Sequence, residues 1–168
     1  MAVMRQMLYV LLSWTLVQGS LAWAQDEPYI GELSMLDKQY MEQQRDLLDQ
    51  LTRSNFGRQL NGNKDNDLEL LQRLLDAGLV KPDQTRELQA MGIVMGDLLA
   101  KELGLDWVIY EDKQGRSRAL RYQQTDNYLF PATMIARRRE VHNTEPVADI
   151  YRRAEQSMRA VIPPLPFQ

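Results

Sequence analysis

The hydrophobic pattern of this chain changes its period at Gly104. Before Gly104, apolar residues recur about every 3.6 positions, which is typical of amphipathic helices. Residues 107–110 are instead aromatic and β-branched, as strands prefer, and the helical period returns after Pro131. A chain with this order has to build a small sheet and cover it with helices, so the pattern predicts an α+β fold.

Three helices are expected before Gly104. The first follows Ser34, whose side chain can cap the helix together with Asp37, and extends to about residue 53. After a polar loop at residues 61–66, a second helix begins near residue 66 or 67 and ends at Gly78. The third begins at Pro82, because proline suits the first helical position, and ends before Gly104.

A three-stranded antiparallel meander is expected next, followed by two helices. The strands are predicted at residues 107–110, 116–122 and 128–130, with a hairpin loop at residues 111–115. Pro131 ends the last strand, because proline cannot donate to a ladder, and opens a helix to about residue 141. A final helix is expected over residues 146–162. We predict that these two helices cover one side of the sheet.

The N-terminus has the three parts of a cleavable signal peptide. Arg5 gives a positive start, residues 8–17 are apolar, and Ala22 and Ala24 are the small residues that precede a cleavage point. The apolar run is too short to span a bilayer. We therefore expect residues 1–24 to be removed, which leaves no stable membrane anchor and a periplasmic or secreted product.

The expected domain organisation follows from this cleavage. Residues 25–33 are predicted to be a flexible leader, residues 34–162 a single α+β domain, and residues 163–168 a proline-rich tail that follows the last helix. The chain has no cysteine, which excludes a lipid anchor on cysteine, thiol chemistry and thiolate metal sites. A formal net charge of −3 argues against nucleic acid as a partner.

Several spaced residues resemble one known family. They are the glycines Gly92, Gly96, Gly104 and Gly115, the aromatic Trp107, and the Phe130-Pro131 pair that precedes Met134 and Arg138. This pattern, over about residues 85–162, resembles the bacterial domain-of-unknown-function family 3806. The resemblance implies no catalytic residue, because the family is uncharacterised.

No catalytic, metal-binding or cofactor-binding set is predicted from the residues. His142 is the only histidine, and it has no cysteine or second histidine with which to share a metal ion, so a surface or capping role is favoured. The acidic residues show no paired-carboxylate arrangement. Gly92 and Gly96 indicate close backbone packing of the third helix against the sheet or the last helix, with a neighbouring ligand pocket as the minor alternative.

The candidate binding residues are aromatic and basic side chains on or near the meander. Core packing is the favoured explanation of the aromatic residues; the alternative is a shallow aromatic site on one sheet face, lined by arginines. A basic patch around the run of arginines at residues 137–139 is a second alternative to an ordinary solvated surface. The candidates are Trp107, Tyr110, Arg118, Arg121, Tyr122, Phe130 and Arg138.

The expected function is a non-catalytic protein-binding module of the cell envelope. Immunity-like or chaperone-like binding of another envelope protein would suit a small exported domain with an uneven charge distribution. The alternative is a small-molecule carrier that uses an aromatic pocket on the sheet. The third possibility is a hydrolase with an unrecognised site. The sequence leaves the oligomeric state open.

Overall fold

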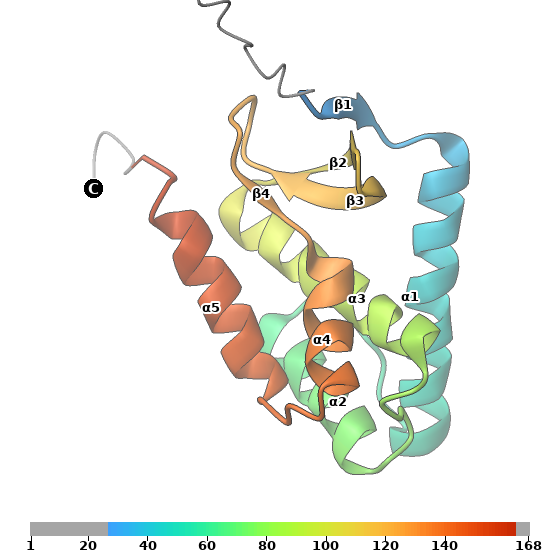
Figure 1. Cartoon of the computed structure of the whole chain (residues 1–168). Coiled ribbons are helices and arrows are strands. Elements are labelled where there is room, and N and C mark those ends of the chain that lie inside the picture. Colours follow the sequence, from blue (N-terminus) through green and yellow to red (C-terminus); the bar gives the residue numbers. More distant parts are fainter. Residues whose placement is uncertain (1–26, 164–168) are drawn as a thin grey trace, which may run out of the picture.

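A computed structural model describes residues 27–163, arranged as five helices and a four-stranded antiparallel sheet (Figure 1). The predicted signal peptide lies outside the described residues, as does the tail after Pro163. The α+β class predicted from the hydrophobic pattern is confirmed. The elements are β1 (Tyr29–Glu32), α1 (Met35–Phe56), α2 (Lys64–Asp76), α3 (Thr85–Leu103), β2 (Asp106–Asp112), β3 (Gly115–Arg121), β4 (Tyr128–Leu129), α4 (Pro131–Glu140) and α5 (Val147–Arg159).

The sheet has one strand more than predicted. Its order is β1-β2-β3-β4, and β1 occupies part of the segment that was expected to be a flexible leader. Tyr29 pairs with Glu111 and Ile30 with Tyr110, across about half the chain. The prediction of a flexible leader was therefore wrong for residues 29–32. A short strand that pairs with a distant segment shows no hydrophobic repeat of its own.

The local signals at the start of α1 are confirmed, whereas α3 starts later than predicted. Ser34 accepts a hydrogen bond from the backbone N–H of Asp37, and the Asp37 carboxylate accepts one from Ser34 in return. α1 continues to Phe56, three residues beyond the expected end, and stops where Gly57 adopts a φ of 64°. Pro82 lies in a turn before α3, because the N–H of Gln84 bonds back to the carbonyl of Lys81.

α3 is the central helix of the molecule, and most of its residues are buried. α1 and α5 lie on opposite sides of the helical body (Figure 1). α5 packs on α2, α3 and α4 through its apolar stripe, so the prediction that both C-terminal helices cover the sheet was wrong for α5. Of the two C-terminal helices, α4 is the one that packs on both α3 and β3. None of the helices within residues 27–163 is long and apolar enough to cross a membrane.

The two glycines of α3 allow the close approach that their spacing indicated. A Cβ atom at Gly92 would lie 2.3 Å from the carbonyl oxygen of Pro131, and one at Gly96 would lie 2.5 Å from the Trp107 ring. Both distances are far inside van der Waals contact. Gly92 therefore lets α3 approach the start of α4, and Gly96 lets it approach the Trp107 side chain of β2.

Candidate functional site

A cleft lies between the free edge of β3 and α4. β4 pairs only with Leu120 and Arg121, so the edge of β3 over residues 115–119 has no neighbouring strand in the described part of the chain. The cleft has a volume of about 510 Å³, and residues 115–118 of β3 line it. The lining side chains of the helices are Tyr40 of α1, Gln89 and Ile93 of α3, and Ala132, Thr133 and Arg137 of α4.

Two arginines of the cleft share one buried carboxylate. Nη1 and Nη2 of Arg116 donate to the two carboxylate oxygens of Asp37 at 2.9 and 2.6 Å, and Nη2 of Arg118 donates to Oδ1 at 2.8 Å. The Asp37 side chain is 3% exposed. The hydrogen bond from Arg116, assisted by Ser34, holds the pKa of Asp37 well below its usual range in spite of burial.

Arg118 and Arg137, two cationic side chains of the cleft, differ in their contacts. The Arg118 guanidinium lies 4.2 Å from the centre of the Tyr40 ring, in cation–π geometry, and its buried Nε has no hydrogen-bond partner in the described part of the chain. Arg137 is exposed and makes no hydrogen bond or ion pair with any residue between 27 and 163. The cleft therefore contains two oriented guanidinium groups and one that is available.

Aromatic rings form part of the cleft wall. Tyr110 meets Phe130 edge-to-face with the ring centres 5.2 Å apart, and it meets Tyr128 in the same way at 5.1 Å. Such pairs stabilise each other beyond the burial of their surface. Tyr110 and Phe130 line the cleft, so this wall is partly apolar.

Three of the predicted binding residues meet in this cleft, and four do not. Tyr110, Arg118 and Phe130 line it. Trp107 instead packs against α3, where its Nε1 donates to Asp97 at 3.0 Å. The other three are held elsewhere: Arg121 bonds to turn carbonyls, Tyr122 packs against the hydrophobic core, and Arg138, in the last turn of α4, bonds to Glu145.

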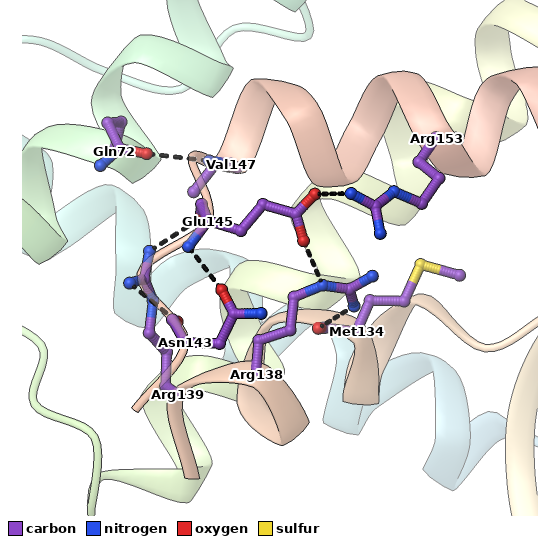
Figure 2. Close-up of polar contacts among 8 residues, drawn as sticks. All are labelled: Gln72, Met134, Arg138, Arg139, Asn143, Glu145, Val147 and Arg153. Atoms are coloured by element: carbon purple, nitrogen blue, oxygen red, sulfur yellow. Dashed lines mark hydrogen bonds and ion pairs between the residues drawn. The ribbon is translucent and has the colours of Figure 1, made fainter. Parts of the chain in front are cut away.

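Figure 2 shows how Arg138 is used. Its Nε donates to Glu145 at 2.8 Å and its Nη1 donates to the carbonyl of Met134 at 2.7 Å. Arg153 pairs with the other oxygen of Glu145, and Arg139 donates to the carbonyls of Asn143 and Glu145. These contacts close the turn between α4 and α5, so they explain Arg138 and Arg139 as structural support for this turn.

Desolvation distinguishes Arg139 from the other arginines of this turn. Its side chain is buried, has carbonyl oxygens rather than a carboxylate as partners, and has an unpartnered Nε. Burial lowers the pKa of Arg139 from its ordinary value. His142 follows in the same turn, exposed, with a φ of 57°. A shallow hollow of about 560 Å³ beside this turn is lined mainly by charged side chains that pair with one another.

A second hollow, of about 330 Å³, is lined by residues of α1, of α3 and of the loop before α2. One wall is a partly exposed ion pair, in which Arg45 donates to Asp97 at 2.7 and 3.0 Å. Asp67, also on this wall, accepts the backbone N–H groups of Asn61 and Gly62. These carboxylates hold helices and a loop together. Within residues 27–163, no three acidic or histidine side chains gather as metal ligands.

The sequence prediction missed the helical half of the cleft. Asp37 was recognised only as a helix cap, and Tyr40, Thr133 and Arg137 were not singled out for this site. Arg116 and Arg118 are two residues apart on a predicted strand, so their placement on one face was a usable signal. The helical residues gave no such signal, because their convergence depends on how α1 and α4 pack beside β3.

Comparisons with known proteins support the fold and the family. A crystal structure of a protein from Bacteroides thetaiotaomicron VPI-5482 resembles this chain with a TM-score of 0.69 at 19% identity, over 76% of this chain and 47% of that one. The present chain thus spans about half the length of that protein, and the likeness shows the fold alone. No curated protein matches the chain. The family model described as Domain of unknown function (DUF3806) matches residues 67–151, and the chain belongs to this family.

Proposed function

We propose that this chain is an exported, non-catalytic binding protein of the cell envelope, and that the cleft between β3 and α4 is where it binds another protein. The observation that carries the proposal is the free edge of β3, which lines a cleft of about 510 Å³ together with the unpaired Arg137. A free strand edge is a ready template for pairing with another chain. The predicted signal peptide supports the location.

The chemistry of the cleft favours binding over reaction. Arg116 and Arg118 are oriented by Asp37, whose pKa is held low by these contacts, so the carboxylate stays ionised and occupied rather than available as a base. Guanidinium groups, a hydroxyl and aromatic edges are the groups that recognise a protein surface. Arginine and tyrosine are also enriched among the residues that dominate binding energy.

The absence of cysteine from the chain allows a position-specific test. Single cysteines replace Ser117 on β3, Thr133 on α4 and, as the matched control, the exposed Ser157 on α5. Each mature protein is labelled with a photoreactive maleimide, mixed with envelope extract of the native bacterium and irradiated. We expect Ser117→Cys and Thr133→Cys to yield the same protein adduct, which unlabelled wild type competes away.

The adduct then has to be reconstituted. The captured protein, purified separately, should bind the wild type and lose about tenfold or more of its affinity for Thr133→Trp, because the larger ring fills the cleft. Ser157→Cys should give no such adduct. If the control yields the same adducts as the cleft positions, or the cleft positions yield none, the proposal is wrong.

A small-molecule carrier is the second candidate, favoured by one observation. The volume of the cleft lies within the range of ligand pockets, and the Tyr110–Phe130 pair adds aromatic surface to a cleft that arginines also line. Native mass spectrometry of protein isolated gently from its own envelope distinguishes the two. A defined small added mass that disappears in Thr133→Trp would favour the carrier, and an added protein mass would favour the binding module.

A further inference from the structure

We propose that the cleft binds an extended acidic segment of the partner. This segment adds as a strand to the free edge of β3, and one of its carboxylates pairs with the Arg137 guanidinium. This inference rests on the proposed function and names the chemistry of the partner. It depends on three observations: an unpaired strand edge, a surplus of guanidinium groups beside that edge, and the position at which α4 begins.

The unpaired edge supplies backbone groups in the right pattern. β3 pairs with β2 over its whole length, but with β4 only at Leu120 and Arg121. Residues of an antiparallel strand alternate between those that bond to one neighbour and those that bond to the other. Every second residue of the segment 115–119 therefore directs its N–H and C=O away from β2, toward the cleft. An added strand would satisfy these groups.

The position of α4 keeps this edge open. β4 stops after Leu129, because Pro131 has no N–H to donate to a ladder and starts α4 as its first residue. α4 therefore replaces the continuation of β4. The side chains of its first turn that line the cleft are small, namely Ala132 and Thr133, which leaves room for an extended backbone beside β3.

The charge of the cleft selects an acidic occupant. Arg116 and Arg118 share the single carboxylate of Asp37, and Asp112 is the one acidic lining residue among those described. The Asp112 carboxylate accepts the backbone N–H of Gln114 within the hairpin turn. Arg137 has no partner among residues 27–163, so a carboxylate from the added segment would complete a charge-assisted pair with it.

The test uses a random linear peptide library selected on the purified mature protein. We expect the selected peptides to share an Asp or Glu at one position and to alternate in side-chain character, as strands do. One such peptide is then measured against Arg137→Glu, which should weaken binding by about tenfold or more. The same exchange at Arg152 on α5, an exposed arginine outside the cleft, is the matched control and should leave affinity unchanged.

Two changes in the peptide separate the parts of the inference. Replacing its acid with Lys should abolish binding to the wild type and restore binding to Arg137→Glu, which a merely destabilised variant could not do. Two further peptides carry N-methyl groups on the odd-numbered or on the even-numbered backbone nitrogens. Only one of the two should lose binding, because an added strand uses every second N–H. Thermal unfolding of each variant checks that it is folded.

The outcomes distinguish this inference from the proposed function. If no peptide is enriched, or if the enriched peptides bind Arg137→Glu as well as the wild type, the inference is wrong. Photo-crosslinking of a protein at Ser117 and Thr133 would still support the proposed function in that case, with a folded surface as the occupant. If crosslinking finds nothing at the cleft, the proposed function fails whatever the peptides show.

Discussion

Asp37 combines three roles at the first turn of α1. It completes the capping box with Ser34, holds two arginines of β3, and is buried while charged. A buried carboxylate is stable only when its oxygens are occupied by donors, and here both oxygens are. One side chain therefore connects the start of the first helix to a strand that lies 79 residues later in the chain.

We predict that Asp37→Asn lowers the free energy of unfolding by about 2–3 kcal/mol near neutral pH, because Arg116 and Arg118 lose their charged partner. Chemical denaturation of both proteins measures the difference. Asp46→Asn, on an exposed position of the same helix, is the control and should change stability by no more than about 0.5 kcal/mol. Equal losses in the two variants would contradict the role of Asp37.

The same pair predicts a dependence on pH with a defined sign. The pKa of Asp37 is lowered in the folded state from its ordinary 3.8. Its contribution is therefore fully present above the unfolded-state pKa and is lost as the pH falls below about 4 toward the folded-state value. We expect the stability difference between wild type and Asp37→Asn to be constant from about pH 5 to 7 and to shrink below pH 4. Denaturation curves at each pH test this.

At the scale of elements, the docking of α4 on α3 depends on a glycine. Alanine normally favours a helix interior over glycine by about 1 kcal/mol. At Gly92 the added Cβ would meet backbone atoms of Pro131 and Ala132, which cannot rotate away as a side chain could. The intrinsic preference and the packing therefore act in opposite directions, and the packing should prevail.

We predict that Gly92→Ala destabilises the protein by about 2 kcal/mol and lowers Tm by roughly 4–8 °C, because α4 is displaced from α3. Thermal unfolding followed by circular dichroism measures it. Ser157→Ala on the exposed surface of α5 should shift Tm by much less. A stabilised Gly92→Ala protein would show that α4 does not depend on this close approach.

The turn between α4 and α5 depends on Glu145, whose side chain is 11% exposed and pairs with Arg138. We predict that Glu145→Gln lowers stability by about 1–2 kcal/mol, because the buried side of the Arg138 guanidinium loses its charged acceptor. Arg153 pairs with the same carboxylate but is 68% exposed, so Arg153→Ala should change stability by no more than about 0.5 kcal/mol. Urea denaturation compares the two, and a reversed order would contradict this assignment.

At the scale of the whole molecule, the proposed function requires that the chain is exported to the cell envelope. We predict that the isolated protein begins at Gln25, because Ala22 and Ala24 satisfy signal peptidase. N-terminal sequencing and the intact mass of protein from envelope extract check this. Ala24→Leu should leave the precursor uncut, whereas Gln18→Asn, outside the cleavage site, should be processed normally. A mature protein that retains Met1 would contradict export by this route.

Local patterns in the sequence were sufficient for most helices and for the hairpin. The Ser34 capping box, the stop of α3 at Gly104 and the β2–β3 hairpin all depend on residues that lie close together in the chain. The α+β class and the family followed from the same kind of signal. Three of the residues that line the cleft, Tyr110, Arg118 and Phe130, were among the candidates from the sequence, because they belong to the meander or directly follow it.

The tertiary structure decided what the local pattern could not encode. Tyr29 and Ile30 form a strand only because β2 offers them an edge. The apolar stripe of α5 shows that one face of this helix is buried, but it does not show which element covers that face, and in the structure other helices cover it. Arg137 joins the cleft through the packing of α4 on α3. Sequence periodicity determined which faces are buried, and long-range packing determined which of those faces meet, because contacts between distant segments leave no period in either segment alone.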